Sequence, residues 1–177
     1  MQSALVIDHA SSADLGPERT AAVRRLCDAA YGTPTQPFFE AIGPGHHLLG
    51  IRDGVLVSHL MWVTRRLEPE GLSPLDTAYV ELVATLPAGQ GRGYATQLLR
   101  ALPPRLAGFE LTALCPATEG LYRRTGWRFW RGPLFVRRGH DLIPTPEERV
   151  MILPLPRTPA LNLDAPLSVE WRPGEVW

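Results

Sequence analysis

The chain has 177 residues, of which 45% are hydrophobic, and its 18 basic and 18 acidic side chains leave no net charge. We therefore expect one domain with a real hydrophobic core, and no electrostatic preference for nucleic acid or an anionic membrane. The first residues do not resemble a signal peptide, and no apolar run reaches membrane-spanning length. Its two cysteines, Cys27 and Cys115, lie far apart in the sequence. A reduced, cytoplasmic protein is the simplest expectation.

The N-terminal quarter predicts a short strand and two helices. The strand covers residues 4–7. The first helix should begin near Gly16, where a proline and an acidic residue suit the first turn, and it should end at Gly32. Its buried stripe is expected to consist of Val23, Leu26, Cys27 and Ala30. A shorter helix is expected over residues 38–42.

A hairpin and a buried strand should follow. Residues 47–51 and 55–62 flank a turn signal at Asp53-Gly54, and we expect the second of these strands to continue to Leu67. Residues 77–85 predict the next strand, which is largely apolar. The histidines at positions 9, 46, 47, 59 and 140 show no metal-ligand spacing, so structural or solvent roles are favoured and no metal is expected.

The segment from Gln90 to Thr96 is rich in glycine and lies between the apolar strand and an amphipathic stretch. The apolar positions of that stretch are Ala95, Leu98, Leu99 and Leu102, which would share one helical face. The order is thus strand, glycine-rich turn, helix. Glycines allow close approach to a ligand, and a helix N-terminus attracts phosphate. This pattern favours a pyrophosphate-bearing cofactor, although a glycine-rich turn without a ligand is the alternative.

The rest of the chain predicts further strands and one more helix. Two prolines at 103 and 104 should end the cofactor helix early. The expected elements are a strand over 109–114, a helix around Tyr122, strands over 127–135 and 150–155, and a polar, proline-rich tail over 155–169 that lies on the surface.

The glycine-rich segment from Gln90 to Thr96 can be compared with three families of phosphate-binding loop. A dinucleotide-binding loop requires G-x-G-x-x-G near the N-terminus, whereas this loop lies mid-chain and has Thr96 in place of the third glycine. A Walker loop requires a lysine, and this chain contains none. The acyl-CoA loop of the GNAT acetyltransferases has the form Q/R-x-x-G-x-G/A. Gln90, Gly93 and Ala95 match that pattern at each defined position.

Two further motifs narrow the resemblance. Residues 121–127 fit L-Y-x-x-x-G-F/W, a second GNAT signature. The tail from Trp171 to Trp177, with Tyr79-Val80-Glu81 and Arg65-Arg66-Leu67, resembles the aminoglycoside 2'-N-acetyltransferase family within the GNAT superfamily. The similarity runs from about His46 to the end of the chain. It implies one α/β (α+β) domain over residues 1–177, with a mixed, mostly antiparallel sheet that is splayed at the cofactor strand and flanked by helices.

The candidate catalytic residues are Glu81 and Tyr122. Glu81 interrupts an apolar strand, where partial desolvation would raise its pKa toward that of a useful base. A solvent-facing or arginine-paired glutamate is the alternative. The resemblance implies that Glu81 accepts a proton through water and that Tyr122 protonates the departing CoA thiolate. The alternative for Tyr122 is a core tyrosine on an amphipathic helix.

The resemblance also implies the cofactor, acetyl-CoA, and the atoms that hold it. The N–H groups near Leu82 and Val83 would polarise the thioester carbonyl, and the pantetheine arm would lie along Val83 to Thr85. The pyrophosphate would lie on Gln90, Gly91, Arg92, Gly93, Tyr94, Ala95 and Thr96. A solvated surface role is about as plausible for Arg92.

The acceptor site is expected to include the tail, residues 156–177. The resemblance places Glu175 and the carboxylate of Trp177 there, beside Glu81 and Leu82, where they suit a cationic amino sugar. Cys115 and Glu148 are further candidates, with packing and solvent roles as alternatives. A tail that only pins the core is the alternative for its tryptophans.

One departure from the family bears on the substrate. Its enzymes for deoxystreptamine drugs carry aspartates after the first helix, whereas residues 32–37 contain no acid. A weakly cationic acceptor such as kasugamycin is therefore favoured over gentamicin, with antibiotic resistance as the outcome. The alternatives are an N-acetyltransferase of another small amine, of a protein or of a peptide N-terminus, and a non-catalytic acetyl-CoA sensor. The oligomeric state is open, a homodimer included.

Overall fold

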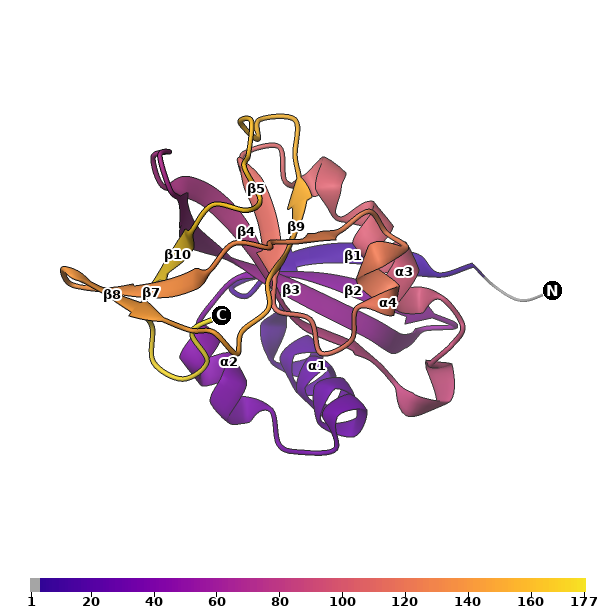
Figure 1. Cartoon of the computed structure of the whole chain (residues 1–177). Helices are drawn as coiled ribbons and strands as arrows, with labels where there is room; N and C mark the ends of the chain where they lie inside the picture. Colours follow the sequence, from indigo (N-terminus) through magenta and orange to yellow (C-terminus); the bar gives the residue numbers. More distant parts are fainter. Residues whose placement is uncertain (1–3) are drawn as a thin grey trace. The chain divides into compact units, whose positions relative to one another are not determined.

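The computed structural model describes residues 4–177. They form two compact units, the first from residues 4–63 and 80–105 and the second from residues 64–79 and 106–177. Two long strands, β3 (Val55–Pro69) and β4 (Leu75–Thr85), contribute residues to both units. Both strands are labelled in Figure 1.

The first unit combines a small antiparallel sheet with three α-helices and two short 3-10 helices. Strand β2 (His46–Arg52) pairs antiparallel with β1 (Val6–Ser11) on one side and with β3 on the other. In Figure 1, α1 (Gly16–Tyr31) and α2 (Gln36–Ile42) lie next to each other below these strands. The remaining elements of this unit are η1 (Pro87–Gly89), α3 (Tyr94–Ala101) and η2 (Pro103–Arg105).

Local sequence signals explain the main boundaries in this unit. Helix α1 ends at Gly32, whose φ of 69° is the left-handed conformation that glycine adopts easily. Its side chains Val23, Leu26 and Cys27 are buried as expected. The β2–β3 hairpin turns at Asp53 and Gly54, with φ of 50° and 77°, as a tight two-residue turn requires.

The second unit has strand pairs of both directions. Strand β5 (Leu111–Leu114) runs parallel to β4 and antiparallel to β9 (Met151–Pro154), which also pairs with β6 (Arg128–Phe129). Strand β10 (Leu167–Glu170) runs antiparallel to β3 and parallel to β7 (Leu134–Arg138), and β7 forms a hairpin with β8 (Asp141–Pro144). This unit also contains the short helix α4 (Gly120–Arg123). The mixed, mostly antiparallel pairing agrees with the prediction.

The structure differs from the expected strands in four places. The first strand begins at Val6 and continues to Ser11, and β8 was missed. The predicted strand over 127–135 is two strands, because the chain turns at Gly132, where a Cβ would lie 2.0 Å from the Ala165 carbonyl oxygen. The predicted surface tail over 155–169 contains much of β10, whose first three residues are buried.

No helix within residues 4–177 is long and apolar enough to cross a membrane. In the same residues, histidine, cysteine and acidic side chains form no group of three or more that could hold a metal ion.

Candidate active site

The part of β4 in the first unit departs from regular strand geometry at Leu82. This leucine has a φ of 49°, a left-handed conformation that costs a non-glycine residue about 1–2 kcal/mol. Side chains donate to three successive carbonyl oxygens here: His59 to Leu82 at 3.0 Å, Tyr31 to Val83 at 3.2 Å, and Ser58 to Ala84 at 3.0 Å. The regular backbone geometry of β4 is therefore interrupted at Leu82, and the partly buried Glu81 directly precedes this residue.

The glycine-rich segment leads from β4 into α3. Gly91 and Gly93 have φ of 73° and 79°, and a Cβ built on either would meet no atom within 4 Å. The first hydrogen bond of α3 runs from the Gln97 N–H to the Gly93 carbonyl at 3.1 Å. The N–H groups of the preceding turn, up to Thr96, therefore have no acceptor within the helix. This open cradle at a helix N-terminus fits a pyrophosphate.

Other side chains of this segment support the loop. Gln90 donates to the Thr85 carbonyl at 3.3 Å, and Ser58 hydrogen-bonds the Thr85 hydroxyl at 2.8 Å. The Tyr94 side chain is buried, and its hydroxyl accepts a hydrogen bond from Arg52. Tyr94 would thus serve a ligand through its backbone N–H alone. Ala95 and Thr96 are partly buried, whereas Arg92 is exposed.

We expect Gly93→Val to abolish the rise in Tm that acetyl-CoA produces in the wild-type protein. The branched side chain would occupy the open cradle, and valine tolerates the positive φ poorly. Thermal unfolding with and without acetyl-CoA measures the effect. Gly16→Val is the matched control, because Gly16 begins a helix with a similar φ of 72° in open space. An unchanged rise in the Gly93 variant would contradict the loop assignment.

The second unit brings four predicted residues into one neighbourhood. Cys115 follows β5, and its thiol lies 3.6 Å from a carboxylate oxygen of Glu148. Partial desolvation, with the Glu148 and Glu175 carboxylates nearby, raises the pKa of Cys115 to about 11. Burial, with a smaller effect of Cys115, raises the pKa of Tyr122 to about 12. Both groups therefore stay protonated at neutral pH, and the Tyr122 phenol can donate a proton.

The last residues of the tail are firmly held. Trp177 is buried, and its indole N–H donates to the Thr145 hydroxyl at 2.8 Å. The Val176 carbonyl accepts from Arg65 at 2.8 Å. Glu175 is exposed, and its carbonyl accepts from Arg172 at 2.6 Å. The C-terminus thus has a defined position in its unit.

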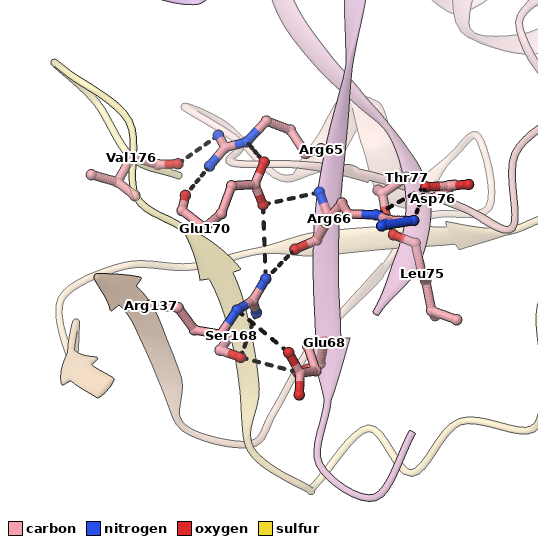
Figure 2. A network of polar contacts seen from close by, with 10 residues as sticks. All are labelled: Arg65, Arg66, Glu68, Leu75, Asp76, Thr77, Arg137, Ser168, Glu170 and Val176. Atoms are coloured by element: carbon pink, nitrogen blue, oxygen red, sulfur yellow. Dashed lines mark hydrogen bonds and ion pairs between the residues drawn. The ribbon is translucent and has the colours of Figure 1, made fainter. Parts of the chain in front are cut away.

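Arg65 is the centre of the network that holds the tail (Figure 2). Its guanidinium is buried and donates to the Glu170 carboxylate at 2.7 Å and to the Glu170 carbonyl at 2.6 Å, besides Val176. The other Glu170 oxygen accepts from the Arg66 backbone N–H at 2.9 Å. The sequence suggested the Arg65-Arg66 motif only as a family feature and did not indicate its partners.

We expect Arg65→Met to lower the free energy of unfolding by about 2–4 kcal/mol, because it removes a buried guanidinium and leaves the acceptors on Glu170 and Val176 without their charged donor. The neighbouring Arg66→Met is the matched control. The Arg66 side chain pairs with Asp76 at 3.1 Å, but both are about half exposed, at 60% and 49%. Its loss should cost less than about 1 kcal/mol. Urea denaturation of the two variants measures the difference, and equal losses would contradict the role of Arg65.

A chain of polar side chains runs through the first unit to the Leu82 carbonyl. The Ser12 hydroxyl lies 2.9 Å from His47 Nε2, and His47 Nδ1 lies 2.9 Å from His59 Nε2. Burial, with His46 and His9 adding to it, lowers the pKa of His47 to about 4. Burial, with His47 adding to it, lowers the pKa of His59 to about 3. The pair is therefore neutral in the native protein at neutral pH.

This neutral pair should make stability fall as the pH drops below about 6.5. In the unfolded chain both histidines protonate near the ordinary pKa of 6.5, but in the native protein they stay neutral down to pH values near 4. Each proton taken up by the unfolded chain alone costs about 1.4 kcal/mol per pH unit. Urea midpoints at pH 7.5, 6.5 and 5.5 measure this loss. A His47→Gln/His59→Gln double variant should show a flatter profile, and an equally steep one would contradict the assignment.

A cavity of about 300 Å³ lies beside His47 in the first unit. Its walls include Val23 and Arg24 of α1, Phe39 and Glu40 of α2, and His47. None of the predicted cofactor or catalytic residues lines this cavity.

Comparison with known proteins decides the family. A model of the "Acetyltransferase (GNAT) domain" matches residues 14–130. The chain is also 32% identical over 174 residues to an aminoglycoside 2'-N-acetyltransferase from Mycolicibacterium fortuitum, and the match covers 94% of this chain and 89% of that protein. The chain belongs to the GNAT acetyltransferases. Within them it belongs to the aminoglycoside 2'-N-acetyltransferase family.

Solved structures agree with this GNAT fold. A GNAT family N-acetyltransferase (YhbS) from Escherichia coli in complex with CoA has a TM-score of 0.61 at 15% identity, over 97% of this chain and 92% of that one. A GNAT family acetyltransferase from Brucella melitensis in complex with acetyl-CoA has a TM-score of 0.52 at 21% identity, over 70% and 83%. Eis1 from Mycobacterium abscessus has a TM-score of 0.59 at 22% identity and covers 69% of this chain, which spans only 31% of Eis1. This chain likewise spans only about a third of two GCN5-related N-acetyltransferases, from Kribbella flavida and Anabaena variabilis, and of a probable N-acyltransferase from Enterococcus faecalis.

Proposed function

We propose that this GNAT acetyltransferase transfers an acetyl group from acetyl-CoA to the 2'-amine of an aminoglycoside antibiotic and so gives resistance in the cytoplasm. The observation that carries the proposal is the similarity, along nearly the whole chain, to an aminoglycoside 2'-N-acetyltransferase. The protein would act as a single GNAT domain on a small amino sugar. Residues 156–177 would contribute to the acceptor site.

Acetyl-CoA would bind through backbone groups of the first unit. The open space at Gly91 and Gly93 and the free N–H groups at the start of α3 fit its pyrophosphate. Val83 to Thr85 would hold the pantetheine arm. The bound thioester supplies the acetyl group, and the N–H groups of Leu82 and Val83 would stabilise negative charge on its carbonyl oxygen.

Proton transfers would complete the reaction. The attacking amine must be neutral, and Glu81 would accept its proton through a water molecule. The amine nitrogen forms the new bond to the acetyl carbon, the carbon–sulfur bond breaks, and the electron pair leaves on the CoA sulfur. Tyr122 would protonate that thiolate, and its raised pKa of about 12 keeps the phenol protonated until then. Cys115, Glu148, Glu175 and the Trp177 carboxylate would line the acceptor site.

The charge near α1 and α2 supports a weakly cationic acceptor. Residues 32–37 contain no acid, and the adjacent Asp28 carboxylate accepts hydrogen bonds from the Thr35 N–H and hydroxyl, both at 2.7 Å. Glu40 accepts from Gln36 at 2.7 Å. Both carboxylates keep their negative charge, because their donors are neutral, but residues 32–37 add none, which makes a polycation a poorer guest. We therefore favour kasugamycin over gentamicin.

An acetylation assay tests this function. The purified protein is incubated with acetyl-CoA and kasugamycin, gentamicin or tobramycin, free CoA is followed with a thiol reagent, and the acetylated amine is located by NMR. We expect acetylation at the 2'-amine and a higher kcat/KM for kasugamycin. Equal or higher kcat/KM for gentamicin would reject the preference. No CoA release with any of the three would reject the function.

A further inference from the structure

The row of hydrogen bonds that links Ser12, His47, His59 and the Leu82 carbonyl, called the polar chain below, can have only one order of donors and acceptors. A carbonyl oxygen can only accept, so at 3.0 Å from the Leu82 carbonyl His59 Nδ1 must carry the proton. Because His59 is neutral, its Nε2 must accept, and His47 Nδ1 must be the donor. His47 Nε2 then accepts from the Ser12 hydroxyl. Three hydrogen bonds thus point the same way and end on one carbonyl.

The side chains of this polar chain have little freedom to move. His59 is fully buried and His47 is 3% exposed. The Ser12 oxygen is fixed in turn, because it accepts the Gly45 N–H at 2.9 Å. The Cys27 sulfur lies 3.7 Å from His59 Nδ1, and burial raises the pKa of Cys27 to about 12, so it stays an uncharged thiol. The exposed His46 and His9 contact each other at 3.2 Å.

The end point of this polar chain is the strained residue of β4. Leu82 has a positive φ, and the peptide group that carries its carbonyl also carries the Val83 N–H. A peptide group is planar, so a hydrogen bond that fixes the carbonyl direction also fixes the opposite direction of that N–H. His59 therefore determines where the Val83 N–H points.

We propose that His59, held by His47 and Ser12, is a positioning residue that fixes the Leu82–Val83 peptide group for acetyl transfer. This inference rests on the proposed function, because it assigns the Val83 N–H to the thioester carbonyl. A donor aimed in advance needs no reorganisation as charge develops, and it favours the transition state more than the bound substrate. Loss of this fixed orientation of the Val83 N–H should therefore lower kcat more than it weakens acetyl-CoA binding.

Three variants test the inference. His59→Leu removes the donor, whereas His59→Asn keeps an amide N–H close to the place of Nδ1. His46→Leu is the matched control, because His46 neighbours His47 but is exposed. We expect His59→Leu to lower kcat about tenfold to a hundredfold, part of what loss of a whole oxyanion donor costs. The acetyl-CoA-induced rise in Tm should persist, His59→Asn should recover most of kcat, and His46→Leu should match the wild type.

An independent measurement does not need turnover. Nitrogen-15 NMR of labelled histidines at pH 7 should show His47 and His59 as neutral Nδ1–H tautomers, and His59→Leu should shift the Val83 amide resonance. An Nε2–H tautomer for His59, or an undiminished kcat in a folded His59→Leu variant, would overturn the inference while leaving the proposed function intact. A wild-type protein that acetylates no amino sugar, yet shows the expected tautomers, would instead reject the proposed function and, with it, the positioning role of His59 in acetyl transfer.

Discussion

Glu81→Gln is expected to lower kcat/KM for the amino sugar by about 10²–10⁴ near neutral pH, the usual contribution of a general base. Glutamine keeps the size of the side chain but cannot accept a proton. The loss should shrink as the pH rises, because the acceptor amine then deprotonates without help. Steady-state kinetics from pH 6.5 to 9.5 measure both the size and the slope.

The control for this variant is Glu18→Gln, the same substitution at an exposed position in the first turn of α1. It should leave kcat/KM unchanged. The acetyl-CoA-induced rise in Tm should be the same in both variants, since neither touches the glycine-rich segment. A loss that does not change with pH would contradict the role of Glu81 as a base and would indicate that it only positions the acceptor.

A tag fused after Trp177 is expected to raise the acceptor KM about tenfold or more. The tag converts the terminal carboxylate into a neutral amide, and a charged hydrogen bond to a substrate ammonium contributes roughly 1.5–3 kcal/mol. The affinity for acetyl-CoA should hardly change. Acceptor KM values of the untagged and tagged proteins provide the measurement, and the same tag at the N-terminus is the control.

The anchoring of the tail allows the alternative to be tested separately. Trp177 is 3% exposed and donates to Thr145, so deletion of residues 176–177 should lower the Tm through lost packing whatever the carboxylate does. The tag leaves the indole in place. If the tail only stabilises the core, deletion should lower stability while the tagged protein keeps a normal acceptor KM. A normal KM in a stable tagged protein would remove the carboxylate from the site.

Features set by neighbouring residues could be predicted from the sequence. The end of α1 at Gly32, the Asp53-Gly54 turn and the strand–glycine–helix order around Gly93 each depend on a few adjacent residues. The family resemblance, which the comparisons confirmed, added the fold and the enzyme class. The role of each candidate site residue stays a prediction.

Features set by distant partners could not be predicted. Strand β10 is short and follows prolines, and it forms because β3 and β7 offer edges on either side. Arg65 contacts Val176, 111 residues away, and neither residue indicates the other. His47 and His59 are 12 residues apart in strands that were predicted, but only the register of those strands brings His47 Nδ1 within 2.9 Å of His59 Nε2.

The division of β3 and β4 between two units limits how relatives can recombine. Residues 64–79 belong with residues 106–177, although residues 80–105 separate them in the chain. A chimera produced by a gene crossover near codon 105 would have the C-terminal part of one parent but the ends of β3 and β4 of the other parent. The pairings of Leu67 with Val169 and of Thr77 with Leu111 would then join strands of different ancestry. Functional chimeras should therefore carry residues 64–79 and 106–177 together, and exchange of the tail alone is a poor route to a new acceptor preference.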